Sequence, residues 1–178
     1  KVADDGKWVV QAGATCKVET AAETAARQAD EAAAPARHMA QAAEAAARGN
    51  VVVTGATGPN ASKINGVWAP KPGEVHNTKL VYRNRVHPDR WLLFDKKGKW
   101  MATDTESKDV NDNKGWCKSV EAGAEDPTRV AAWKVWDGSQ LVVQAAVACK
   151  FESSDAEAAR ADAAAALAGG PPLGHLNH

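Results

Sequence analysis

VVVTGATGPNAS, residues 51–62, is the stretch on which the choice of fold class depends. A run of valines leads into two glycines, and the spacing Gly55-x-x-Gly58-x-x-Ala61 is that of a phosphate-binding turn. Such a turn holds a pyrophosphate only where a helix comes next, because the helix N-terminus binds the anion. The next residues therefore decide between a dinucleotide-binding α/β protein and a strand that ends in an ordinary turn.

The residues after Gly58 favour the ordinary turn. The spacing resembles the turn of extended short-chain dehydrogenases, but residues 59–66 leave room for only a single turn of helix. That family's Tyr-x-x-x-Lys is absent, because Tyr82 is followed by RNRV, and no Walker Gly-Lys-Ser/Thr occurs. We expect the glycines to supply positive φ for a bend. An NAD(P)-binding oxidoreductase is thus the weakest functional alternative.

Residues 50–152 instead predict short antiparallel strands. RWLLFD (90–95) and KWMAT (99–103) flank a Lys-Lys-Gly turn, and residues 132–135 and 141–150 flank Asp137-Gly138. Both patterns indicate hairpins. Further strands are expected at 51–53, at 79–83 and at 66–68, the last ended by prolines. With no helical period between them, these strands predict a compact sandwich or small barrel in an α+β chain.

The two ends of the chain repeat one another. Residues 9–19, VVQAGATCKVE, match residues 142–152, VVQAAVACKFE, at an offset of 133 with seven of eleven positions identical. Asp5-Gly6 matches Asp137-Gly138 at an offset of 132, which predicts one residue gained in a turn. So long a period indicates an array of small domains, not a solenoid. We therefore expect residues 1–19 to be the terminal hairpin of a preceding unit, and the chain to be a piece of something larger.

Alanine-rich segments flank the β-rich unit. Residues 20–48 hold 15 alanines among 29, and Thr20-x-x-Glu23 and Ser154-x-x-Glu157 have the form of capping boxes. We expect a helical spacer over 20–49, kinked at Pro35, the β domain over 50–152, and a second Ala-rich helix with a Gly/Pro tail over 153–178. The helices have almost no large apolar stripe. Solvated spacers are favoured over close packing on a neighbouring domain.

The charge balance argues against some partners. Lys plus Arg and Asp plus Glu are both 22, so the formal net charge is zero. A neutral chain gives no electrostatic reason to expect nucleic acid as a partner. No apolar run is long enough for a transmembrane helix.

The tryptophans are the first candidate site residues. A small β domain buries large side chains, so core packing is the favoured role for most of the seven. Trp133 and Trp136 are an odd number of residues apart and should face opposite sides of a strand, whereas Trp91 and Trp100 should lie near each other across a hairpin. An exposed surface formed by Trp91, Trp100 and Trp136 could stack on sugar rings.

Three further groups of residues are candidates for an anion site, a metal site and a disulfide. Tyr82, Arg83 and Arg85, with the basic residues up to Lys99, could hold an anionic ligand, although a solvated sheet face is favoured. The loop from Asp104 to Asn113 is rich in oxygen ligands but lacks EF-hand spacing, so no metal is expected. Cys117 and Cys149 could form a disulfide or remain free thiols.

The runs ATGPNASKINGVWAP, VYR, DRWLLFDKKGKWMAT, GWC and WKVWDG together resemble a known repeat. It is the Trp-containing β-rich tandem repeat of large proteins in dinoflagellate and haptophyte algae. The resemblance covers residues 50–152, and residues 1–19 match the tail of such a unit. It implies a non-enzymatic structural or interaction module, a scaffold whose partners are neighbouring repeats or other subunits, with no cofactor. A carbohydrate-type ligand-binding module is the alternative.

Overall fold

The computed structural model describes residues 2–4, 7–9 and 19–168. The chain forms two compact units, Lys1–Pro35 and Ala36–His178, and each is described by itself. In the first unit, β1 (Val2–Asp4) pairs with β2 (Lys7–Val9). Helix α1 (Ala21–Ala47) contains Pro35 without being split there. The capping box forms as predicted: the Thr20 amide donates to Glu23 Oε2 at 2.8 Å, and the Glu23 amide to Thr20 Oγ1 at 3.2 Å.

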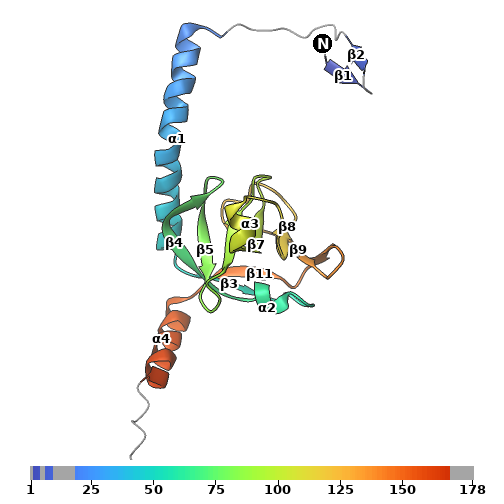
Figure 1. Cartoon of the computed structure of the whole chain (residues 1–178). Coiled ribbons are helices and arrows are strands. Elements are labelled where there is room, and N and C mark those ends of the chain that lie inside the picture. The colour runs from blue at the N-terminus through green and yellow to red at the C-terminus, as the bar shows by residue number, and fades with distance from the viewer. Residues whose placement is uncertain (1, 5–6, 10–18, 169–178) are drawn as a thin grey trace, which may run out of the picture. The chain divides into compact units, whose positions relative to one another are not determined.

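The second unit is built on one curled antiparallel sheet of nine strands, a half-barrel (Figure 1). Its strands are β3 (Val51–Thr54), β4 (Gly66–His76), β5 (Lys79–Asn84), β6 (Arg90–Phe94), β7 (Trp100–Asp104), β8 (Cys117–Ser119), β9 (Trp133–Trp136), β10 (Leu141–Gln144) and β11 (Ala148–Phe151). The remaining elements are α2 (Ala61–Ile64), α3 (Thr105–Asp109), a 3₁₀ turn at Pro127–Arg129 and α4 (Ser154–Ala168). The prediction of an antiparallel β-rich domain in an α+β chain is confirmed, as a single curled sheet and not a two-sheet sandwich.

The curl brings the two edges of the sheet to one short connection. The strand order runs from β10 through β9 and down to β3 and β11. Strands β10 and β11 are consecutive in sequence, so residues 145–147 alone link the two edges. Gln144 also bridges this link to the loop after β3, because its Oε1 accepts from the Thr57 amide at 2.9 Å. The segment 141–151 therefore provides both edge strands of the curled sheet, β10 and β11, and the link between them.

The opening glycines take part in this closure. Gly55 has φ +82°, and a Cβ placed on it would lie 1.8 Å from the carbonyl oxygen of Ala146. Gly58 has φ +88° and open space around it. Only a four-residue helix, α2, comes next, and β3 and β4 pair antiparallel, so the geometry is not that of a parallel βαβ unit. The expected positive-φ bend is confirmed, and Gly55 has the further role of admitting a neighbouring backbone.

Three local expectations were wrong. Strand β4 does not end at its prolines, because a register shift between Pro70 and Val75 accommodates them in the pairing with β5. The expected cap at Ser154 lies one residue earlier, where Ser153 Oγ accepts from the Ala156 amide at 3.2 Å. The C-terminal part of α1 is packed and not fully solvated, since Ala42 is buried in the core of the sheet domain.

Two apolar clusters hold the domain together. The larger includes Trp68, Tyr82, Trp100 and Trp133 on the inner, concave face of the sheet. The smaller consists of Val81, Trp91, Leu93 and Met101. Because neighbouring residues of a strand alternate between faces, Val81 and Tyr82 assign the two clusters to opposite faces. We call the face of the smaller cluster the outer face.

Candidate functional site: an indole-lined groove on the outer face

Two of the predicted surface residues belong to the core. Tyr82 is fully buried and Trp100 is 1% exposed, with their ring centroids 6.2 Å apart. The Trp100 indole donates to the carbonyl of Ala124 at 3.0 Å. The Tyr82 hydroxyl is buried without a hydrogen-bond partner, and its burial raises the pKa of Tyr82 to about 12. Trp100 therefore cannot serve as a platform for a sugar ring.

Trp91 is also covered, on the opposite face from Trp100. It is 6% exposed, with the guanidinium of Arg83 5.1 Å and the ammonium of Lys108 4.6 Å from its ring centroid. The expectation that Trp91 and Trp100 lie together was wrong. Trp91 pairs with Thr103, three residues from Trp100, so the two indoles project to different faces.

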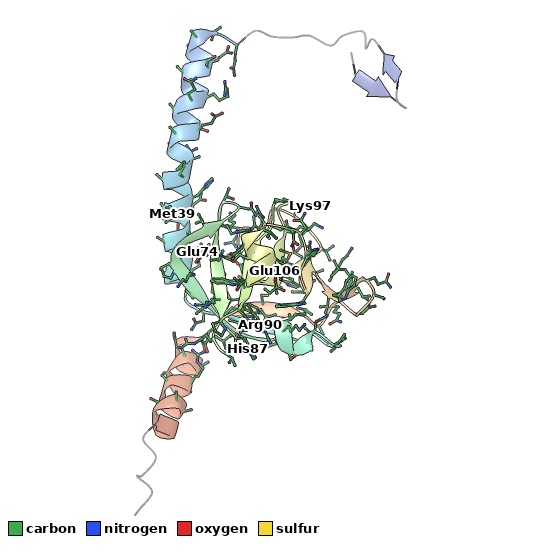
Figure 2. All side chains as sticks on the ribbon, in the orientation of Figure 1. Met39, Glu74, His87, Arg90, Lys97 and Glu106 are labelled. Carbon is green, nitrogen blue, oxygen red and sulfur yellow. The ribbon has the colours of Figure 1, made fainter. Side chains whose placement is uncertain are left out.

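The basic residues do not gather into one site. Arg83 is engaged with Trp91 and donates from Nε to the carbonyl of Pro88 at 2.5 Å, while Arg85 is exposed. Figure 2 shows Arg90 and Lys97 toward opposite ends of the domain, because Arg90 begins β6 and Lys97 lies in the turn after it. The structure therefore places Tyr82 in the core and Arg83 against Trp91, so these two do not form one anion site.

Trp136 is the predicted tryptophan that reaches solvent. It is 38% exposed, whereas Trp133 on the same strand is buried, which confirms that the two face opposite sides. Its cross-strand partner is Leu141, and its amide donates to the carbonyl of Trp116 on the other side. These three residues line a groove of about 460 Å³. We call it the Trp136 groove.

Polar residues form the rest of the Trp136 groove. They are Thr103, Asp104, Ser107, Asn113, Lys114 and Lys118. Several are already engaged: Asp104 Oδ1 caps α3 by accepting from the Ser107 amide at 2.8 Å, and the Thr103 hydroxyl donates to the carbonyl of Lys114 at 2.8 Å. The Asn113 Oδ1 atom is buried and has no hydrogen-bond partner. That oxygen is enclosed by the protein and is not open to the groove.

The charges near the groove are nearly balanced. Burial lowers the pKa of Lys118, against the opposing effect of Asp95, whose Oδ2 lies 3.6 Å from the ammonium. Lys114 is 3.4 Å from Asp112, and the backbone amide of Lys114 holds the pKa of that carboxyl below its usual value. On Trp116, Lys63 stacks at 5.2 Å from the ring centroid. The groove therefore has donors and acceptors without a strong field of one sign.

A second cavity lies between the C-terminal part of α1 and the sheet. It measures about 330 Å³ and includes Tyr82, Trp100, Arg48 and Asp126 in its lining. Arg48 donates to Asp126 at 2.9 Å, and Asp126 is further held by the Thr128 amide. The charged groups in this cavity are thus largely paired with one another.

Of the two states left open for the cysteines of the sheet domain, the structure shows free thiols. Cys117 and Cys149 are free and buried. Burial raises the pKa of the Cys117 thiol to about 12, and it raises the pKa of Cys149 as well. Neither thiol is a ready nucleophile, because the thiolate is the reactive form. Cys16 lies outside the described residues.

Among the residues that the structure describes, no group of three or more His, Cys, Asp or Glu side chains could hold a metal ion. Over that same part of the chain, no helix has the length and apolarity needed to cross a bilayer. No protein-family model, no curated protein and no solved structure matches the chain.

Sequence reasoning did not find Trp116, Leu141 or Asn113 as groove residues. Trp116 comes after Gly115 in a loop, and only the pairing of β8 with β9 brings it beside Trp136. Gly115 itself was a usable signal. A Cβ there would lie 2.4 Å from Met101 Cγ, so this position requires glycine to pack the Trp116 loop against β7.

Proposed function

We propose that the chain is a non-enzymatic structural and interaction module, built from tandem copies of the curled-sheet domain and acting within a larger assembly. Its immediate partners are neighbouring copies of this domain. The Ala-rich helices are the spacers between copies. The resemblance to the Trp-containing algal repeats belongs to the same proposal.

The observation that carries the proposal is a recurring hairpin register. In the first unit Val2 pairs with Val9 and Ala3 with Trp8. In the sheet domain Val135 pairs with Val142, and Trp136 with Leu141. Every one of these residues is related to its counterpart by an offset of 133. Asp5-Gly6 and Asp137-Gly138 remain related by 132 in the sequence, whereas the paired strand residues keep an offset of 133.

An ion pair after the hairpin recurs at the same offset. Glu152 accepts from Arg160 at 2.9 Å, and Glu19 lies 3.3 Å from Arg27. The side chain of Glu152 is 6% exposed, since the side-chain amide of Asn50 donates to it at 2.8 Å. The side chain of Glu19 is 48% exposed. We infer that Glu19 accepts a hydrogen bond from a residue equivalent to Asn50 when a preceding domain is present.

This junction ties the two helices of a unit together. Asn50 lies just after α1, and its side-chain amide also donates to Glu157 in α4 at 3.1 Å. The backbone joins as well, because the Glu152 amide donates to the carbonyl of Asn50 at 2.8 Å. A helix entering the domain and a helix leaving it thus share one anchoring point. Such an anchor suits a module that sets the spacing of its neighbours.

A fusion protein tests the repeat. Residues 20–133 are placed directly before Lys1, so that residues 1–19 complete a second sheet domain in the observed register. We expect two folded domains, seen as a roughly doubled unfolding amplitude, and protection of the Arg27 region from proteolysis. The matched control has one alanine inserted at the fusion point, which reverses the faces of the hairpin residues. Equal behaviour of the two fusions, or an added segment that stays unfolded, would overturn the proposal.

The assembly is tested on the native protein by crosslinking mass spectrometry. Lysines of residues 50–152 should link to equivalent lysines of other copies or to neighbouring subunits. A native protein that is monomeric, with links only inside one domain, would contradict an assembly role.

A further inference from the structure

The cross-strand pair at the Trp136 groove keeps an indole in both units. In the sheet domain Trp136 lies opposite Leu141. At the corresponding pair of the first unit, Ala3 lies opposite Trp8. The tryptophan is on the first strand of the hairpin in the sheet domain and on the second strand in the first unit. The aliphatic residue is on the other strand in each case. Simple inheritance would have kept the tryptophan on the same strand, so the exchange indicates a requirement for an indole at this place.

Core packing does not supply that requirement in the sheet domain. Trp136 remains 38% exposed, and the apolar clusters of buried residues are formed by other side chains. Val143, two residues from Leu141 on the same face, is 53% exposed. An exposed indole that lines a groove, with lysines beside it on the same face, is typical of a binding surface.

The polar side of the groove limits what could bind there. An apolar ligand would cover the carboxylate of Asp104, which is costly. A hydroxyl group would donate to it. The Asp104 carboxylate can accept further hydrogen bonds, and Lys114, whose side chain is 86% exposed, can donate them.

We propose that the Trp136 groove binds a saccharide. The apolar C–H face of a pyranose ring would lie on the Trp136 indole, and its hydroxyls would pair with Asp104 and Lys114. The volume of about 460 Å³ is within the range of small-ligand sites. This goes beyond the proposed function, since a repeat array needs no ligand. A tryptophan recurs at this cross-strand pair in both units, which implies one such site in each copy of the domain. An array of copies would then bind a saccharide at several sites at once.

The test uses the full chain and two oligosaccharide probes, cellohexaose as a neutral β-glucan and hexagalacturonate as a polyuronate. Titrations are followed by isothermal calorimetry and by the indole N–H resonances in NMR spectra, with Trp136 assigned through Trp136→Phe. One probe or both should shift the Trp136 resonance. Binding of cellohexaose alone assigns neutral sugars to the groove, and binding of hexagalacturonate assigns acidic ones.

Matched variants decide whether the groove is responsible. Trp136→Ala should weaken binding about tenfold or more, as expected for losing an aromatic stacking surface. Lys114→Met, which keeps most of the length of the side chain but removes the donor, should weaken it about fivefold or more. Val86→Ala, at an exposed residue outside the groove, should leave affinity within about twofold. Near-UV circular dichroism checks that each variant is folded.

Three outcomes would overturn the proposal. The first is no shift of the Trp136 resonance by either saccharide at about 10 mM, a concentration that detects even weak sites. The second is unchanged affinity in Trp136→Ala. The third is binding of the apolar probe N-acetyl-leucinamide in place of the saccharides, which would make the groove a docking site for protein side chains. None of these bears on the fusion experiment, so the two proposals fail separately.

Discussion

Replacing Gly55 by alanine tests how the sheet is closed. In the structure a Cβ on Gly55 would lie 1.8 Å from the carbonyl oxygen of Ala146 and 2.6 Å from its carbonyl carbon. Both are backbone atoms in the three-residue link between β10 and β11. They cannot rotate away as a side chain would, so the two segments must separate.

The expected loss has two parts. Alanine in the left-handed region costs about 1–2 kcal/mol, and Gly55 has φ +82°. Forcing a methyl group into an occupied space costs about a further 1–3 kcal/mol. The free energy of unfolding should therefore fall by about 2–5 kcal/mol. For a domain of this size, that corresponds to a fall in Tm of roughly 10–25 °C.

Gly58→Ala is the matched control. Gly58 has φ +88°, nearly that of Gly55, but nothing lies within 4 Å of its Cβ position. It should lose only the conformational part, about 1–2 kcal/mol. Urea denaturation followed by tryptophan fluorescence measures both variants. Equal losses in the two variants would refute the close approach as the reason for Gly55.

Three further outcomes concern the contacts of single side chains. Trp100→Ala should cost about 3–5 kcal/mol of stability by core truncation, whereas Trp136→Ala should cost under about 1 kcal/mol; urea denaturation compares them, and similar losses would mean that Trp136 is a core residue. Cys117 and Cys149 should resist a thiol reagent at pH 8 until the protein unfolds, in a Cys16→Ser background; intact mass without reductant, lower by about 2 Da, would instead reveal a disulfide. Burial lowers the pKa of His76 from 6.5, so the unfolded state binds more protons and stability should fall as pH drops below about 6.5. His76→Gln should flatten that fall in denaturation measured between pH 7.5 and about 5, and an unchanged slope would contradict a lowered pKa of His76 in the folded protein.

The hairpins were predictable because their turns carry local chemistry. The prediction of strands on both sides of Gly98 rests on turn residues and alternation within a few positions, and β6 and β7 confirm it. The strand predicted at residues 66–68 was too short, because proline usually ends a strand. Only its pairing with β5, with a register shift that absorbs Pro70 and Pro72, allows it to continue.

The groove was harder to predict because its residues come from separate segments. Alternation along β9 correctly opposed Trp133 and Trp136, yet it could not say which one faced the core. That choice depends on the direction of curl, which is a property of the whole sheet. Trp91 and Trp100 show the same limit. They lie on either side of one short turn in the sequence, but the pairing register of β6 with β7, which the sequence does not reveal, places them on opposite faces.

The motif in VVVTGATG was ambiguous for a physical reason. Glycine at such a turn permits two things, positive φ and the close approach of another group to the backbone. In a dinucleotide site the approaching group is a phosphate, and here it is the carbonyl of Ala146. The local sequence specifies the space and not its occupant. The next element separates the two cases: a long helix would direct its N-terminus at an anion, whereas α2 ends after four residues and the chain returns antiparallel in β4. The missing side chain at Gly55 therefore makes room for the link between β10 and β11. The carbonyl of Ala146 occupies the space that a phosphate would need.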